Sequence, residues 1–169
     1  MKIPRDWTFK KFSIAKGFDR HVREQLPWYD LATGIVRHIV RHYLNRGGLV
    51  YDIGASTGNI GKSISDILKN REASFIAIDN SEEMLKLYSG PGKIELWNAE
   101  EYEYKNFDIA ICFLSLLFLS QEKKVLKNIV SILTCEMYAR EHSQSNKRNN
   151  DAAKEKDSGE NAGKVLLQG

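Results

Sequence analysis

Residues 51–64, YDIGASTGNIGKSI, contain two overlapping patterns that predict different chemistry. The segment GASTG (54–58) fits G-x-S-x-G, in which the serine is the nucleophile of a hydrolase. With Asp52 in front, the same segment fits D-x-G-x-[GS]-x-G, a glycine loop that holds a nucleoside cofactor. Ser56 is therefore either a nucleophile or a small residue that packs beside a cofactor.

The hydrolase interpretation needs a histidine base and an acid that follow the serine in the chain. The only histidine after Ser56 is His142, which stands at the start of a polar C-terminal segment. No complete triad can be assembled from these residues. The sequence therefore disfavours a hydrolase.

The cofactor interpretation needs a carboxylate about 20 residues beyond the glycine loop, where it would bind both ribose hydroxyls. Asp79 stands 21 residues after Gly58 and directly follows the apolar segment FIAI. Gly54 and Gly58 would let the backbone approach a ligand, and the free amides of a helix starting at Asn59 would face it. The residues favour a nucleoside cofactor.

S-adenosyl-L-methionine (SAM) fits this loop better than NAD does. The dinucleotide pattern G-x-G-x-x-G would need glycines where Ser56 and Asn59 stand. In the SAM interpretation Asp52 would orient the loop and the methionine part of the cofactor. Ser56 is then a small loop residue.

The elements around the loop alternate between strand and helix periodicity. We predict strands over 49–54, 73–79, 93–97 and 107–113, and helices that begin near Asn59, at Ser81 and at Glu122. Two helices precede them, one that stops at Pro27 and one that runs from Asp30 to Gly47. Strands that alternate with helices indicate right-handed βαβ units and a parallel sheet.

The helix that starts at Asp30 has an apolar side and a basic side. Its apolar residues form one predicted stripe: Ile35, Val36, Ile39, Val40, Tyr43 and Leu44. His38 and His42 are spaced as helical metal ligands would be, but arginines flank them and no carboxylate joins them. We therefore predict no metal site.

Length and composition are those of one globular domain. The chain has 169 residues, of which 42% are hydrophobic and 28% charged. No apolar run approaches the ~20 residues of a membrane span, and the N-terminus lacks the apolar region of a signal peptide. Cys112 and Cys135 make no disulfide framework, which indicates a cytoplasmic protein. The net charge of +3 is too small to imply a nucleic-acid partner.

Three segments resemble class I SAM-dependent methyltransferases: VYDIGASTG (50–58), FIAIDNSEEML (75–85) and FDIAICFLSLLFL (107–119). Within that class the chain is most similar to the carboxy-SAM synthase family and its phage-borne relatives. Members of that family make a carboxylated SAM used in modifying the wobble uridine of transfer RNA. The resemblance covers roughly residues 14–133 and implies a Rossmann-like α/β fold with strand order 3-2-1-4.

The resemblance also implies a set of cofactor-binding residues. The cofactor loop corresponds to Gly54, Ala55 and Ser56, and the ribose and adenine contacts to Asp79 and Asn80. Tyr29 corresponds to a tyrosine of the helical cap that closes over the ligand, and Asn98 and Ala99 to a pair that meets the adenine. Phe113 stands where the family has an asparagine near the cofactor. This departure from the family pattern counts against specificity for the carboxylated cofactor.

The match to the family ends at about residue 133. Together with the helical segment before the first strand, this end divides the chain into three predicted parts. We expect a helical cap over 1–46, a SAM-binding core over 47–133 and a divergent, mostly disordered tail over 134–169. Nothing in the tail matches the last three strands of the family fold. The strand at 107–113 would then be an exposed edge through which the chain could self-associate.

The segment after the fourth strand limits the acceptor. It carries neither the [DNS]-P-P-[YFW] of amino-group DNA methylases nor the Pro-Cys of cytosine-ring methylases, so DNA is disfavoured. Three functions stay open: methyl transfer to a small molecule or a tRNA-related acceptor, carboxy-SAM synthesis, and SAM binding without turnover. No catalytic residue is assigned.

Overall fold

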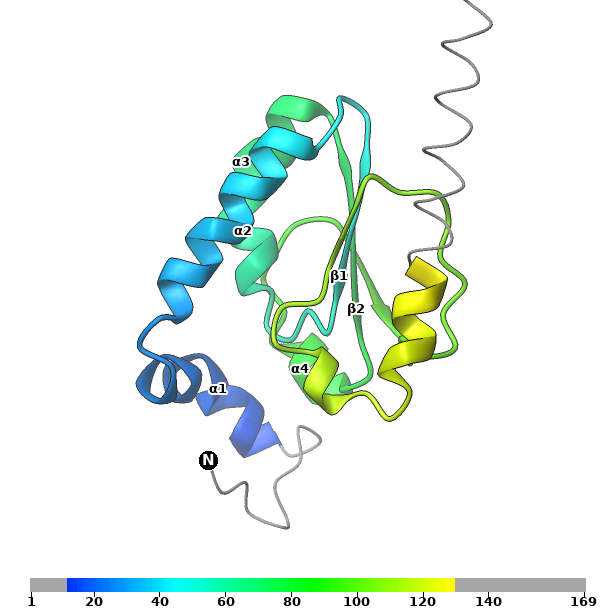
Figure 1. Cartoon of the computed structure of the whole chain (residues 1–169). Coiled ribbons are helices and arrows are strands. Elements are labelled where there is room, and N and C mark those ends of the chain that lie inside the picture. The colour runs from blue at the N-terminus through cyan, green and yellow to red at the C-terminus, as the bar shows by residue number, and fades with distance from the viewer. Residues whose placement is uncertain (1–11, 130–169) are drawn as a thin grey trace, which may run out of the picture.

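A computed structural model describes residues 12–129 as a parallel sheet of four strands between helices (Figure 1). The strands are β1 (Leu49–Ile53), β2 (Ser74–Asp79), β3 (Lys93–Leu96) and β4 (Ile109–Ile111), in the order β3-β2-β1-β4. All three pairings are parallel. The predicted α/β class and strand order are confirmed.

Apart from η1, the helices lie where the sequence predicts them. They are α1 (Phe12–Gln25), α2 (Tyr29–Tyr43), α3 (Asn59–Arg71), α4 (Glu82–Lys86), a 3-10 turn η1 (Leu116–Phe118) and a helix over 122–129. α1 stops before Pro27 because a proline disfavours helical geometry in the residue ahead of it. α4 begins at Ser81, whose hydroxyl accepts a hydrogen bond from the Met84 amide at 3.3 Å.

Both faces of the sheet are buried at its central strand β1, whereas β3 at the edge is largely exposed. Side chains of β1 alternate between the faces, so that Val50 packs with α2 and α3 whereas Tyr51 packs toward the helix over 122–129. Figure 1 shows α2 and α3 together on one side of the sheet and the 122–129 helix, in yellow, on the other. This core holds the carboxyl ends of β1, β2 and β4 at one edge of the sheet.

One prediction about an individual element was wrong in detail. β4 spans only Ile109–Ile111 and not 107–113, because only this segment pairs with residues 50–52 of β1. The apolar stripe of α2 is not buried throughout: Ile35, Ile39 and Tyr43 are 45–72% exposed. The residues of this stripe that pack in the core with α3 are Val36, Val40 and Leu44, and the Arg37 guanidinium binds the Asp66 carboxylate of α3 at 2.6 Å.

Several expectations concern residues outside the described range. They are the end of the last helix at 130–133, the tail over 134–169 and the missing later strands. Within residues 12–129, no helix is long and apolar enough to cross a membrane.

Candidate cofactor site

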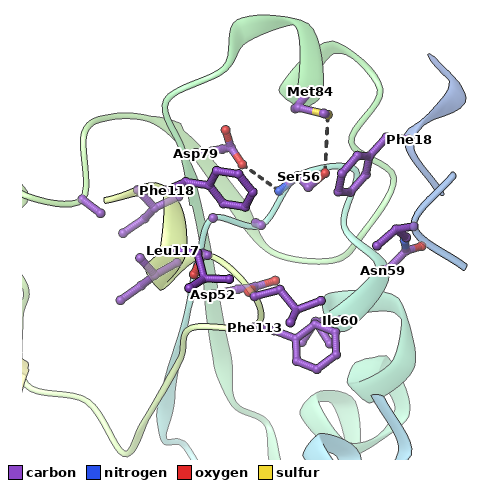
Figure 2. A pocket seen from close by; sticks show the side chains of 18 of the residues that line it. Phe18, Asp52, Ser56, Asn59, Ile60, Asp79, Met84, Phe113, Leu117 and Phe118 are labelled. Carbon is purple, nitrogen blue, oxygen red and sulfur yellow. Dashed lines mark hydrogen bonds between the residues drawn. The ribbon is translucent and has the colours of Figure 1, made fainter. Parts of the chain in front are cut away.

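A cavity of about 450 Å³ opens where the chain leaves β1, β2 and β4. In open parallel sheets, ligands bind in the crevice outside the carboxyl ends of the strands. Figure 2 shows side chains from the β1–α3 loop, from β2 and from the segment after β4 pointing into this space. The cavity is therefore the candidate site.

The loop between β1 and α3 owes its path to backbone geometry that favours glycine. φ is +78° at Gly54 and +90° at Gly58, and Ser56 also adopts a positive φ of +52°. A Cβ at Gly54 would collide with the side chain of Ser115, and one at Gly58 would lie 2.8 Å from the Tyr88 ring. Both glycines are thus required by the protein's own packing.

Asp79, the last residue of β2, holds this loop. Its Oδ2 accepts a hydrogen bond from the Ser56 amide at 2.8 Å (Figure 2). Its Oδ1 accepts one from the Ser81 amide at 2.8 Å. Burial raises the pKa of Asp79, and the hydrogen bonds from Ser81 and Ser56 partly offset that effect. Each oxygen keeps a second lone pair with which to accept a ligand hydroxyl.

Asp52 lies beside this carboxylate without the same support. It is 1% exposed, lines the cavity, and its Oδ2 has no hydrogen-bond partner among the described residues. Burial, and then the nearby charge of Asp79, raise the pKa of Asp52 to about 7. A buried carboxylate without a partner is costly, so this site suits a ligand that brings a positive charge.

The N-terminal helices are tied to the glycine loop. Asp19 of α1 accepts hydrogen bonds from the Thr57 hydroxyl at 2.6 Å and from the side-chain Nδ2 of Asn59 at 2.8 Å. Tyr29, at the start of α2, is 5% exposed, and its ring lies 5.3 Å from that of Phe113. Asp19 therefore joins α1 to the loop, and Tyr29 of α2 packs against the segment after β4.

Most of the predicted cofactor-binding residues meet at the cavity. The lining contains Tyr29, Asp52, Gly54, Ala55, Ser56, Asp79, Asn80 and Ala99. Gly58 and Asn98 are not part of the lining. Gly58 precedes α3 and packs on Tyr88, while the Asn98 side chain accepts a hydrogen bond from the Glu100 amide at 3.1 Å.

Sequence reasoning missed the residues that hold the site together from a distance. Asp19 belongs to no motif and lies in an ordinary amphipathic helix, so its role in fixing the loop has no local signal. Glu100 is another: its carboxylate accepts hydrogen bonds from the amides of Ser120 at 2.6 Å and Gln121 at 2.9 Å. It thereby holds the segment after β4, which forms one wall of the cavity.

The hydrogen bond of the Ser56 hydroxyl is not that of a catalytic nucleophile. Its hydroxyl donates to the sulfur of Met84 at 3.4 Å (Figure 2), and not to an imidazole or a carboxylate. In the part of the chain that the structure describes, no group of three or more His, Cys, Asp or Glu side chains could hold a metal ion.

The sheet order is that of a Rossmann-like cofactor-binding protein. A glycine loop after β1 and a carboxylate at the end of β2 complete this pattern. The profile of a family described as "Methyltransferase domain" matches residues 51–136. The chain belongs to this methyltransferase domain family, whose cofactor or substrate is SAM.

Two curated relatives are carboxy-SAM synthases. The one from Staphylococcus epidermidis is 35% identical over 133 residues, which make up 75% of this chain and 58% of that protein. The one from Sulfurimonas denitrificans is 33% identical over 140 residues, 78% of this chain and 59% of that protein. The chain thus spans a little under three fifths of the length of these relatives.

A solved structure supports the fold. A protein of Methanococcus maripaludis, provisionally assigned as a SAM-dependent methyltransferase, superposes with a TM-score of 0.55 at 19% identity. The match covers 78% of this chain and 63% of that protein.

Proposed function

We propose that the chain binds SAM in this cavity and transfers its methyl group to a small molecule or a tRNA-related acceptor. One observation carries the proposal: the carboxylates of Asp52 and Asp79 lie together beside a glycine loop, and one oxygen of Asp52 is buried without a partner. SAM carries a ribose and a cationic amino-acid part, which are the two groups that these carboxylates suit.

In this proposal each group of predicted residues contacts a different part of the cofactor. Asp79 and Asn80 bind the ribose and adenine, with Asn98 and Ala99 at the far side of the base. The loop residues Gly54, Ala55 and Ser56 approach the cofactor with their backbone, and Gly58 sets the start of α3. Asp52 faces the methionine part.

We also propose where the helical cap and the SAM-binding core begin and end. The cap would comprise residues 1–46, with Tyr29 closing over the ligand, and the SAM-binding core residues 47–133. Asp19 supports this division, because it joins the cap to the core through Thr57 and Asn59.

Methyl transfer needs the acceptor in line with the bond that breaks, and little more from the protein. The nucleophile of the acceptor takes the methyl group from sulfur, which keeps the bonding electron pair and leaves as the neutral thioether. No described side chain is assigned a catalytic role. We propose the cytoplasm as the compartment, where Cys112 would remain a free thiol.

Carboxy-SAM synthesis is the alternative function, and the names of the two relatives favour it. Two observations oppose it. Phe113 lies against Tyr29 at the cavity, and no lysine or arginine is among the described residues that line the cavity. An additional carboxylate on the cofactor would therefore meet an aromatic ring and two acidic groups. SAM binding without turnover is the third possibility.

The ligand that the chain retains through purification separates these functions. Mass spectrometry of the extracted ligand should find SAM or its demethylated product, S-adenosylhomocysteine. Calorimetry should then give a dissociation constant for SAM at least tenfold below that for carboxy-SAM. A carboxylated ligand, or equal affinity for both, would establish the alternative. SAM binding with no methyl transfer to any of a panel of acceptors would favour the non-catalytic form.

A further inference from the structure

Large apolar side chains surround the mouth of the cavity and are about half exposed or more. Trp28, Trp97, Leu117 and Phe118 all line it, and they are 46%, 53%, 86% and 53% exposed. We call these four residues the rim. They come from three separate places: the α1–α2 connection, the end of β3 and η1. Exposed apolar groups that gather around a pocket from distant segments indicate a binding surface.

The charges inside the cavity restrict what the rim can bind. Asp52 and Asp79 are the carboxylates of the lining, and no lysine or arginine of residues 12–129 is part of it. His21 of α1 is the one histidine of the described lining, whereas Arg23 lies over the Tyr29 ring at 5.1 Å and donates to Asp30 at 3.0 Å. An anionic group at the mouth would thus face two acidic residues and find no lysine or arginine in the described lining to bind it.

The wall that carries Leu117 and Phe118 is held in place by the protein itself. The Phe118 amide donates to the Ser115 carbonyl at 3.0 Å, and Ser115 packs against Gly54 of the cofactor loop. At its other end, the Ser120 amide and hydroxyl both bind Glu100. Because these contacts need no ligand, this part of the rim is already arranged before anything binds.

We propose that the rim is the acceptor subsite and that the acceptor is an uncharged small molecule with an aromatic ring. This inference rests on the proposed methyltransferase function, and it narrows the acceptor class. Indole rings and a phenyl ring favour an aromatic partner, since ring faces and edges attract each other beyond the area that they bury. A transfer RNA would bring phosphates, which require lysines and arginines that the described lining of this mouth does not present.

Binding of neutral and anionic aromatic probes tests the proposal. Calorimetry would measure indole and indole-3-carboxylate against the full chain, with and without saturating S-adenosylhomocysteine. We expect indole to bind at least tenfold more tightly than its carboxylate. A transfer RNA should show no binding at physiological salt.

A substitution on the rim supplies the second measurement. Leu117→Asp should weaken indole binding at least tenfold and leave the affinity for S-adenosylhomocysteine within a few fold. Leu31→Asp is the matched control, because Leu31 is 71% exposed on α2 and does not line the cavity. It should leave indole binding unchanged.

The outcomes separate this inference from the proposed function. The rim is not an apolar acceptor subsite if indole-3-carboxylate binds as tightly as indole or more tightly. The same conclusion follows if the RNA binds in a salt-dependent way, or if Leu117→Asp leaves the affinity for indole unchanged. Failure of S-adenosylhomocysteine to bind, with indole still selected over its carboxylate, would instead overturn the cofactor assignment alone.

Discussion

The carboxylate of Asp79, at the end of β2, accepts the backbone N–H of Ser56 in the β1–α3 loop at 2.8 Å. One side chain therefore fixes the loop and also faces the cavity in which the cofactor is proposed to bind. The two tasks are compatible because a carboxylate oxygen can accept more than one hydrogen bond.

Replacing Asp79 should weaken SAM binding. We expect Asp79→Ala to cost about 1–3 kcal/mol of binding free energy, from lost charge-assisted hydrogen bonds to the ribose hydroxyls. Asp79→Asn keeps the shape of the side chain and one acceptor oxygen, so its affinity for SAM should lie between that of Asp79→Ala and that of the unchanged chain. Calorimetry measures both variants, and an unchanged affinity in Asp79→Ala would remove the central assignment of the site.

Removing the Ser56 hydroxyl should have little effect. In Ser56→Ala only a weak contact to the Met84 sulfur is lost, while the backbone N–H that Asp79 binds is retained. SAM affinity should stay within a few fold. An esterase assay is the complementary measurement, since an activity that this one substitution abolished would restore the hydrolase interpretation.

Asp52 should make the stability of the ligand-free chain depend on pH. Its pKa is raised to about 7, so the folded chain binds this proton more tightly than the unfolded chain does. The contribution of Asp52 is therefore most favourable below about pH 4 and is lost as the pH rises from about 4 to about 7.

The comparison with Asp52→Asn isolates this effect, because the amide cannot ionise. Urea unfolding from pH 4 to pH 8 should show the variant gaining stability relative to the unchanged chain, by a few kcal/mol at the upper end. A difference between the two chains that stayed constant over this range would show that Asp52 titrates normally.

The contact between the cap and the loop should contribute to stability. Asp19→Ala removes both acceptor contacts to Thr57 and Asn59, and we expect it to cost about 1–3 kcal/mol of unfolding free energy. Asp30→Ala is the control: its ion pair with Arg23 is exposed and should contribute less than about 1 kcal/mol. Equal losses in the two variants in urea unfolding would mean that Asp19 is an ordinary surface residue.

The edge at β4 should promote self-association. β4 pairs with β1 on one side, and on its other side no described strand pairs with it. Unpaired backbone groups beside apolar side chains can pair with another chain. Sedimentation velocity at micromolar concentration should therefore detect dimers or larger species, whereas a single monomeric species would show that this edge is covered.

Local patterns in the sequence were sufficient for the sheet and the cofactor loop. Period-two apolar segments mark the strands, and a parallel sheet built from them brings the residues that follow β1 and β2 to one edge. The spacing between Gly58 and Asp79 is a property of one βαβ unit. Because that unit folds within about 30 residues, its geometry can be read from consecutive residues.

Contacts between distant segments were decided only by the tertiary structure. Asp19 binds Asn59 across 40 positions of the chain, and Glu100 binds Ser120 across 20. Such pairs leave no periodic signal, since they depend on how α1 and the segment after β4 pack on the core. The same packing buries Asp52 with its Oδ2 lacking a partner among the described residues, and it leaves the rim and part of α2 exposed. Apolar spacing identifies a helix, but the neighbouring elements determine which of its apolar residues are covered.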